Sequence, residues 1–456
     1  MAASLLLVLV VGSVPAVAIA RSVLVGIPLG AAVLLIVSSV GATVATLFGW
    51  PLTPCVLAVA LTSLVAAGWA SFRAPDRLPV RAGTDLGLLA LLGVPSVAAF
   101  TLFPYLPIQW DARSIWWFHA SWFQYGGETV RHSIANPHFS FSHPDYPAGV
   151  PAAIALLWRF TGSTENLPIA GTLTAVLTGL AVCGLAAVLV DDHRETANIA
   201  SALALIMATA ALGGGLAAGG YVDVLGAALL VTSLAALTYL PTERLALTAG
   251  SLALAGATLT KNEGFVFGIA VLAVAVAATR HRRGRVAIVG AIALAPALAW
   301  QVAVASTGAT ITGDVSASGF LDLWRAEPLR RMSIAGPRVL AETLPFIGPA
   351  AVALALVWLA VRRRPPRERH RVDAADLRPA AALVVAALLT DVIVLFVYGA
   401  GRIEIRWWLG TSAERVVTTP RLFALASLVV LANVITKLVA PRAAQRAGAT
   451  SGAGMQ

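Results

Sequence analysis

Residues 22–72 read SVLVGIPLGAAVLLIVSSVGATVATLFGWPLTPCVLAVALTSLVAAGWASF and contain no Asp, Glu, Lys or Arg. A helix that crosses a bilayer needs about 20 mostly apolar residues, so this stretch is long enough to cross twice. Lipid offers the backbone no hydrogen-bond partner, and a chain that crosses it therefore folds as a helix. The stretch predicts two successive membrane-spanning helices.

The same property recurs along the chain. Further windows without an acidic or basic residue are 2–20, 86–110, 166–190, 196–222, 224–242, 245–260, 264–279, 286–313, 343–361 and 422–436, and Asp391 alone interrupts 379–401. Because 245–260 and 264–279 are short, we expect the flanking Arg and Lys side chains to extend to the membrane surface. We predict an all-α polytopic membrane protein with about 13 transmembrane helices.

Composition excludes other classes. The 456-residue chain is 58% apolar and 12% charged, whereas a soluble domain carries about 25% charged residues. A soluble enzyme is thereby excluded, and high hydrophobicity excludes disorder. Cys55 and Cys183 lie inside apolar windows and indicate neither a disulfide framework nor a metal site.

Basic residues collect on one side of the predicted helices. That side holds 20 of the 32 Lys and Arg residues, mainly within 73–81, 280–285 and 362–378, and the positive-inside rule makes it cytoplasmic. We expect a multi-pass protein of a bacterial plasma membrane, with its N-terminus outside and its C-terminus in the cytoplasm. Residues 1–20 resemble a signal peptide but lack a positive n-region, so we favour a retained helix over a cleaved signal.

The predicted organisation has three parts. They are extra transmembrane helices at 1–84, a core at 85–440 with external loops at 106–165 and 304–341, and a disordered cytoplasmic tail at 441–456.

Polar residues are scarce, and their clusters fall on the non-cytoplasmic side. In the first, Asp111 and Arg113 stand among four tryptophans after the window 86–110. An aromatic belt at the membrane surface explains the tryptophans but needs no carboxylate, which makes Asp111 a candidate for chemistry. In the second, a His-Pro-Asp-Tyr-Pro run contains His143, Asp145 and Tyr146.

That second cluster allows two interpretations. His138, His143 and Asp145 form a weak candidate metal set. A proline-rich turn capped by Asp145 explains the same residues without a metal.

Two clusters stand where predicted helices begin. Tyr221 and Asp223 follow a glycine-rich run, and glycine lets a backbone approach a ligand or a neighbouring helix closely. A carboxylate at a helix start is favourable in any case. Lys261, Asn262 and Glu263 form a turn between two short windows. Charges at membrane depth are costly unless they are paired or functional.

The fifth cluster is basic and includes Arg402, Arg406, Arg415 and Arg421. Basic residues on the outer face suit an anion, either a lipid phosphate or the membrane surface itself. Asp391, in mid-window, is either paired within the bundle or functional.

The order of these clusters resembles that of a known family. An acidic residue followed by tryptophans, a His-Pro-Asp-Tyr-Pro turn, a Gly-Tyr-x-Asp helix start, a Thr-Lys-Asn-Glu-Gly turn and a late Ser-x-x-Arg are similar to features of the GT-C integral-membrane glycosyltransferases. The resemblance spans roughly residues 85–435 and is nearest to the branch related to protein O-mannosyltransferases and lipid A aminoarabinose transferases. It implies a GT-C-like fold with a large first external loop that carries interfacial helices.

The resemblance also implies a reaction, in which a sugar passes with inversion from a polyprenyl-phosphate donor to a glycan, lipid or protein acceptor of the cell envelope. Asp111 would be the general base, and no cofactor is implied beyond an open question about a divalent metal. The implied substrate-binding residues are Arg113, His143, Asp145, Tyr146, Tyr221, Asp223, Lys261, Asn262, Glu263 and Arg415. Independently of the resemblance, a carboxylate can take a hydroxyl proton, and Lys or Arg can meet the charge of a leaving phosphate.

Two other functions stay open. A transporter or flippase of lipid-linked sugars needs polar groups along a path through the bilayer, whereas only Asp391 lies deep here. A non-catalytic scaffold in envelope assembly is the second alternative. We expect no nucleic-acid partner.

Overall fold

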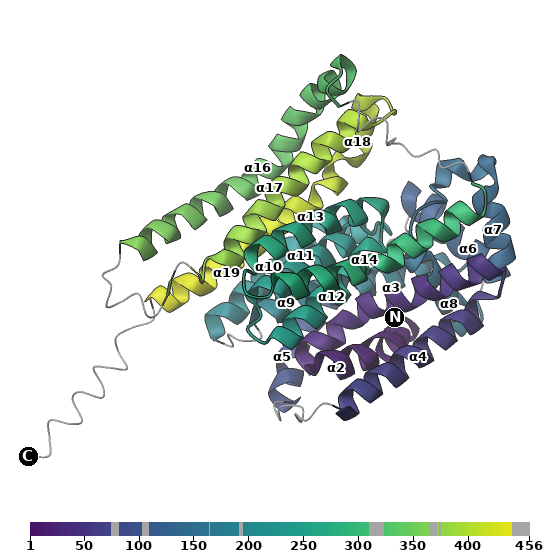
Figure 1. Cartoon of the computed structure of the whole chain (residues 1–456), viewed down its shortest axis with the longest axis horizontal. Coiled ribbons are helices and arrows are strands. Elements are labelled where there is room, and N and C mark those ends of the chain that lie inside the picture. The colour runs from purple at the N-terminus through teal and green to yellow at the C-terminus, as the bar shows by residue number, and fades with distance from the viewer. Residues whose placement is uncertain are drawn as a thin grey trace, which may run out of the picture.

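The computed structural model describes residues 1–73, 82–102, 109–163, 165–190, 195–309, 323–363, 372–373 and 375–439. Within these ranges the regular elements are all helices, with short π- and 3-10 segments (Figure 1). Ten helical segments are long and apolar enough to cross a membrane, by length and composition. The chain is therefore an all-α, polytopic membrane protein.

Each charge-free window of the sequence is occupied by a helix. In chain order these helices are α1 (Ala2–Leu7), η1 (Val8–Ser13) and α2 (Val14–Ala20) as one segment, then α3 (Val23–Phe48), α4 (Leu52–Arg73), α5 (Ala82–Thr101), α9 (Leu167–Val190), α10 (Thr196–Ala218), α11 (Asp223–Tyr239), α12 (Glu243–Thr258), α13 (Asn262–Ala278), α14 (Arg283–Ser306), α16 (Ala326–Arg362), α17 (Arg378–Ala400) and α19 (Thr418–Val439). Only α11, α12 and α13 fall short of spanning length, at 16 to 17 residues. Ten crossings are supported, and thirteen stays a prediction.

The region between α5 and α9 is built from short helices. They are η2 (Ala112–Trp117), α6 (Phe118–Tyr125), α7 (Gly127–Ala135), η3 (Pro137–Ser142) and α8 (Gly149–Thr161). The ring of Phe118 contacts those of Trp122 and Phe139, with centroids 5.0 and 5.1 Å away. The predicted loop 106–165 is thus largely helical where it is described, and its place at a membrane surface stays a prediction.

The helix α16 takes up part of the predicted external loop 304–341. It begins at Ala326 and has 37 residues, which is about 55 Å of helix. Charged residues interrupt the apolar window but not the helix, and within it Glu327 accepts from Arg330 at 2.8 Å. Arg331 is buried and donates to the carbonyl oxygens of Tyr398 and Ile403. The helix runs along the edge of the molecule beside α17 (Figure 1).

The N-terminal segment packs closely on α3. Ser13 Oγ donates to the carbonyl oxygen of Ile27 at 2.8 Å, and a Cβ at Gly12 would collide with the backbone of Gly30. Small residues of this kind let membrane helices approach one another. Such packing is what a retained helix at 1–20 requires. The predicted tail 441–456 lies outside the described residues.

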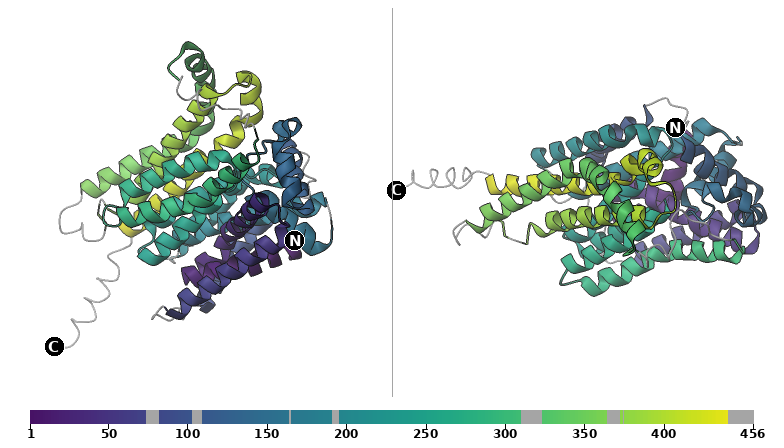
Figure 2. Two further views of the ribbon diagram at one scale, coloured as in Figure 1. Left: turned by 45° about the vertical axis from the view of Figure 1, so that its right-hand side comes forward. Right: turned by 90° about the horizontal axis from the view of Figure 1, so that it is seen from above.

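The bundle has three groups of helices. The N-terminal helices α1 to α4 lie on one side, the C-terminal helices α16 to α19 on the other, and α9 to α14 run between them (Figures 1 and 2). The helix α3 packs on both α9 and α12, so the predicted boundary at residue 84 falls within one continuous bundle.

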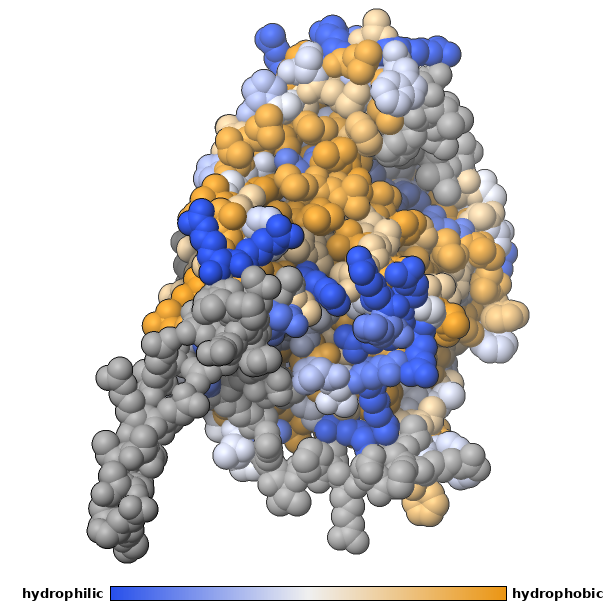
Figure 3. All heavy atoms as spheres, turned by 60° about the vertical axis from the view of Figure 1, so that its left-hand side comes forward, coloured by the Kyte–Doolittle hydropathy of each residue, from blue (hydrophilic) through white to orange (hydrophobic). Residues whose placement is uncertain are grey.

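Successive long helices alternate in direction. The end of α10 therefore lies at the same end of the bundle as the starts of α11, α13 and α18 (Ile405–Val416). Basic residues that the alternation assigns to the opposite end are Arg21, Arg244, Arg280, Arg282, Arg283, Arg285, Arg362, Arg363, Arg378 and Lys437. Figure 3, which brings the left-hand side of Figure 1 forward, shows hydrophilic side chains gathered below a broad apolar surface.

Candidate functional site

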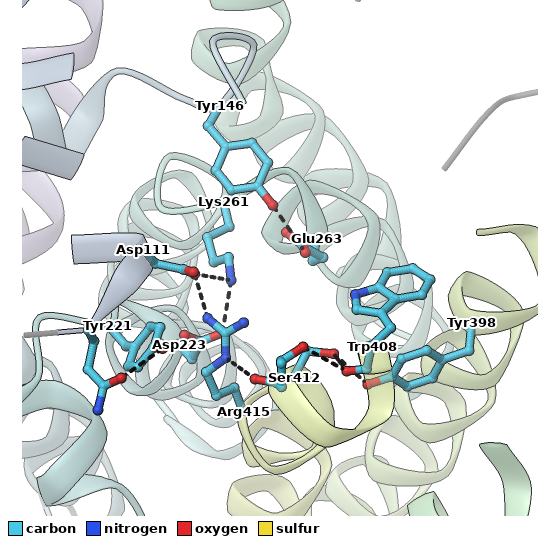
Figure 4. A network of polar contacts seen from close by, with 12 residues as sticks. Asp111, Tyr146, Tyr221, Asp223, Lys261, Glu263, Tyr398, Trp408, Ser412 and Arg415 are labelled. Atoms are coloured by element: carbon cyan, nitrogen blue, oxygen red, sulfur yellow. Dashed lines mark hydrogen bonds and ion pairs between the residues drawn. The ribbon is translucent and has the colours of Figure 1, made fainter. Parts of the chain in front are cut away.

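Four charged side chains from distant parts of the chain meet at one end of the bundle (Figure 4). Asp111 Oδ2 accepts a hydrogen bond from Arg415 Nη1 at 2.5 Å and lies 3.9 Å from Lys261 Nζ. Lys261 Nζ in turn donates to Asp223 Oδ1 at 3.1 Å. The exposed fractions of these four side chains are 7 to 14%. The structure therefore joins four of the five clusters seen in the sequence, and we call these residues the charged quartet.

Local sequence explains how two members of the charged quartet reach each other. Asp223 is the first residue of α11, where a carboxylate is favourable. Lys261 immediately precedes α13 and follows Thr260. A Cβ at Gly226 would lie 2.7 Å from Thr260 Oγ1, so the glycine lets α11 approach this turn. The glycine thereby brings Lys261 within hydrogen-bond distance of Asp223.

Charges in the quartet compensate one another. Burial lowers the pKa of Lys261, but the carboxylates of Asp223, Glu263 and Asp111 outweigh it and hold that pKa above its ordinary value. The ammonium group therefore keeps its proton. Two cations facing two carboxylates leave no net charge, which limits the cost of burying them.

Tyr221 supports the guanidinium of Arg415. Its ring centroid lies 4.4 Å from Arg415 Cζ, in a cation–π contact. Its hydroxyl donates to Gln109 Oε1 at 3.3 Å. Burial raises the pKa of Tyr221, and the nearby carboxylates of Asp111 and Asp223 act in the same direction, so the hydroxyl remains a donor.

A second group of polar residues faces the charged quartet, and we call it the acceptor wall. It comprises His143, Asp145, Tyr146, Asn262 and Glu263. Asn262 Nδ2 donates to Asp145 Oδ2 at 2.6 Å, and Tyr146 Oη donates to Glu263 Oε1 at 3.5 Å. The rings of His143 and Tyr146 stack at 4.9 Å. Burial raises the pKa of Asp145, and His143 and Asn262 oppose the rise.

Three members of the charged quartet, Asp111, Lys261 and Arg415, share one cavity of about 260 Å³ with the acceptor wall, whereas Asp223 lines a smaller adjoining cavity. The remaining sides of the larger cavity are largely apolar. They are formed by Ile115, Val266, Phe267, Ile393, Val394, Val397, Tyr398, Trp408, Ser412 and Val416. A few polar groups converging in an apolar cavity are typical of ligand sites, although the volume is just below the usual range of about 300 Å³ and more.

Two predicted residues lie elsewhere. Arg113 and His138 are exposed and do not line the cavity. Among the described residues, no group of three or more His, Cys, Asp or Glu is placed to hold a metal ion. The candidate metal set of His138, His143 and Asp145 is therefore not brought together. The turn capped by Asp145 stays a prediction, since the Asp145 carboxylate accepts from Asn262 Nδ2 at 2.6 Å and it is Asn136 that accepts from the His138 amide.

Several residues of the site were not predicted. Tyr398 Oη lies 2.9 Å from Ser412 Oγ, and its ring meets that of Trp408 edge-on at 4.9 Å. Gln301 Nε2 donates to the carbonyl oxygen of Asp145 at 3.1 Å, and Trp300 Nε1 donates to the same oxygen at 3.2 Å. Two signals were available in the sequence: Ser412 in the Ser-x-x-Arg motif, and an uncharged amide at 301 in a charge-free window.

Asp391 lies outside the cavity. It is buried in α17, and its Oδ2 accepts from Thr343 Oγ1 of α16 at 3.2 Å. One of its oxygens is thus bonded within the bundle, while its Oδ1 is buried without a hydrogen-bond partner among the described residues.

Comparisons with known proteins add no further constraint: no family model matches the sequence, no curated protein matches it, and no solved structure matches the fold. The chemistry of the cavity is argued below from its own residues.

Proposed function

We propose that the chain is a GT-C-type membrane glycosyltransferase that moves a sugar from a polyprenyl-phosphate donor to an acceptor of the cell envelope. One observation supports this most strongly: the Asp111 carboxylate shares a cavity with two cations, Arg415 at 2.5 Å and Lys261 at 3.9 Å. Transfer from a phosphate needs a base for the acceptor and positive charge for the leaving group.

The proposed step uses these groups directly. The acceptor hydroxyl passes its proton to Asp111 while its oxygen attacks the anomeric carbon. The bond from that carbon to the phosphate oxygen breaks on the opposite face, which inverts the configuration. The bonding electrons leave with polyprenyl phosphate, whose added negative charge Lys261 and Arg415 stabilise. Asp111 then returns its proton to water.

In the structure Arg415 and Lys261 hold the Asp111 carboxylate, at 2.5 and 3.9 Å. A donor phosphate competes with Asp111 for Arg415, whose guanidinium stays anchored by the Tyr221 ring and by the carbonyl oxygen of Thr411 at 3.2 Å. Donor binding thereby frees Asp111 for the acceptor.

The surroundings suit a lipid-linked donor. Val266 and Phe267 of α13 and Val394 of α17 line the cavity, and Val266 is 40% exposed. An apolar path from the cavity to lipid can take a polyprenyl tail, each buried methylene contributing about 0.8 kcal/mol. We propose, on the positive-inside rule, that the basic helix ends lie in the cytoplasm and that the cavity opens outside.

A transporter of lipid-linked sugars is less well supported. It needs polar groups that continue through the bilayer, whereas the charged quartet lies at helix ends and Asp391 does not line the cavity. A non-catalytic scaffold has no need of the charged quartet.

The test is a transfer assay with protein in lipid nanodiscs, radiolabelled polyprenyl-phosphate sugars and envelope extract as acceptor. We expect transfer by the wild type and none by Asp111→Asn, with Glu128→Gln as the matched control because the Glu128 side chain is 65% exposed. Movement of label across a vesicle without transfer identifies a flippase. The proposal is refuted if the wild type shows neither transfer nor movement of label, or if Asp111→Asn transfers the sugar as well as the wild type does.

A further inference from the structure

The acceptor wall is rich in oxygen atoms. Asn262 Nδ2 already donates to Asp145 Oδ2 at 2.6 Å, and Asn262 Oδ1 accepts from Gln301 Nε2 at 3.3 Å. Gln301 also donates to the carbonyl oxygen of Asp145. These bonds fix the orientation of the Asn262 amide and direct both of its groups toward protein partners. The wall is thus held rigid from behind, by α14.

Glu263 is the least satisfied member of the wall. It lines the main cavity and also a smaller adjoining one of about 30 Å³. Among the residues that the structure describes, its Oε1 has one long contact, with Tyr146 Oη at 3.5 Å, and its Oε2 is buried without a hydrogen-bond partner. A buried acceptor without a donor is costly, so a donor supplied by a ligand would stabilise this arrangement.

The charges of the cavity also favour a ligand that brings a hydrogen-bond donor, rather than an anion, to Glu263. The cations of the cavity are Lys261 and Arg415, and the carboxylates of the two adjoining cavities are Asp111, Asp145, Asp223 and Glu263. The charged quartet is neutral by itself, so the carboxylates of the acceptor wall add negative charge to the cavity. A ligand that carries a further anion on the side of Glu263 would be repelled.

We infer that Glu263, with Asp145 behind it, is a sugar-recognition subsite for a ring that presents hydroxyl or ammonium donors and carries no carboxylate. This inference rests on the proposed function, since the charged quartet then takes the phosphate and the acceptor wall takes the sugar. Glu263 accepts hydrogen bonds from the ring, and Asp145 positions the wall through Asn262.

The test separates the sugar from the phosphate. Wild type and Glu263→Gln, in nanodiscs, are titrated with undecaprenyl phosphate and with its mannosyl, glucosyl, aminoarabinosyl and glucuronosyl esters. We expect at least one neutral or amino sugar to bind about tenfold more tightly than the bare lipid phosphate, as hydrogen bonds to a charged acceptor allow. The glucuronosyl ester should bind about a hundredfold more weakly than that sugar.

Glu263→Gln should lose the preference for the sugar but keep its affinity for the bare lipid phosphate. Glu128→Gln is the matched control, and Asp145→Asn replaces Glu263→Gln if the latter unfolds at lower temperature. This inference is overturned if Glu263→Gln keeps the preference for the sugar ester over the bare lipid phosphate, or if the glucuronosyl ester binds tightly. In either case, binding of the bare lipid phosphate leaves the proposed function standing. If the wild type binds none of these lipids, both proposals fall.

Discussion

Removing the charge of Asp111 should strengthen the binding of a bare lipid phosphate while it abolishes transfer. The charged quartet contains two cations and two carboxylates, and Asp111→Asn leaves the cations in excess. The variant keeps the shape of the side chain, so Lys261 and Arg415 stay in place. An anion then meets two cations that no longer bind a competing carboxylate.

The size of the effect follows from the geometry. Asp111 Oδ2 lies 2.5 Å from Arg415 Nη1 and 3.9 Å from Lys261 Nζ. A phosphate that contacts both cations therefore lies about 5 Å from that carboxylate, where repulsion at an effective dielectric of about 20 amounts to ~3 kcal/mol. Relief of this repulsion predicts an affinity gain on the order of a hundredfold. Loss of the base lowers the transfer rate by about 10² to 10⁴.

Affinity is measured by titrating undecaprenyl phosphate into nanodisc-embedded wild type, Asp111→Asn and Arg415→Gln. The transfer rate is measured on the same preparations. Arg415→Gln should bind the lipid more weakly than the wild type. Weaker binding by Asp111→Asn would show that its carboxylate does not compete with a phosphate, and the assignment of the cations to the donor would fail.

Three further predictions concern stability and the alternative function. Lys261→Met leaves the buried Asp223 carboxylate without its cation and should cost about 3–5 kcal/mol; thermal unfolding compared with Lys261→Arg measures this, and equal midpoints would contradict it. Burial and the charge of His143 lower the pKa of His119 from 6.5 to about 3. The contribution of neutral His119 to the free energy of unfolding is therefore present above pH 6.5 and is lost as the pH falls toward 3. The loss amounts to about 2 kcal/mol at pH 5. Unfolding curves recorded from pH 7 to 4 should lack this loss in His119→Phe. Asp391→Asn should keep full transfer and equal or greater stability, because it removes a buried charge; loss of transfer would instead favour a path through the bilayer.

Most of the helical architecture could be predicted from charge-free windows. Lipid disfavours charged side chains along the whole length of a span, so the absence of charge extends over a long window and is easily recognised. Where charges are paired or buried within a helix, the signal fails. Arg331 illustrates this in α16, since it donates to two backbone carbonyl oxygens and so tolerates burial.

The site was partly predictable for a related reason. Charged residues are rare in this chain, so Asp111, Lys261 and Arg415 stood out before their contacts were known. Uncharged polar residues such as Gln301 and Tyr398 gave little signal, because apolar windows tolerate them. Arg113 shows the opposite error: it stood beside Asp111 in the sequence, but it is exposed.

The charged quartet also sets an order for biosynthesis. Arg415 lies in α18, the last but one of the described helices, and so leaves the ribosome long after Asp111, Asp223 and Lys261. Until that helix is inserted, the nascent chain carries two carboxylates against a single lysine in this region. The charged quartet can reach its neutral charge balance only near the end of translation. Chains truncated before residue 405 should therefore be recognised and degraded as incomplete.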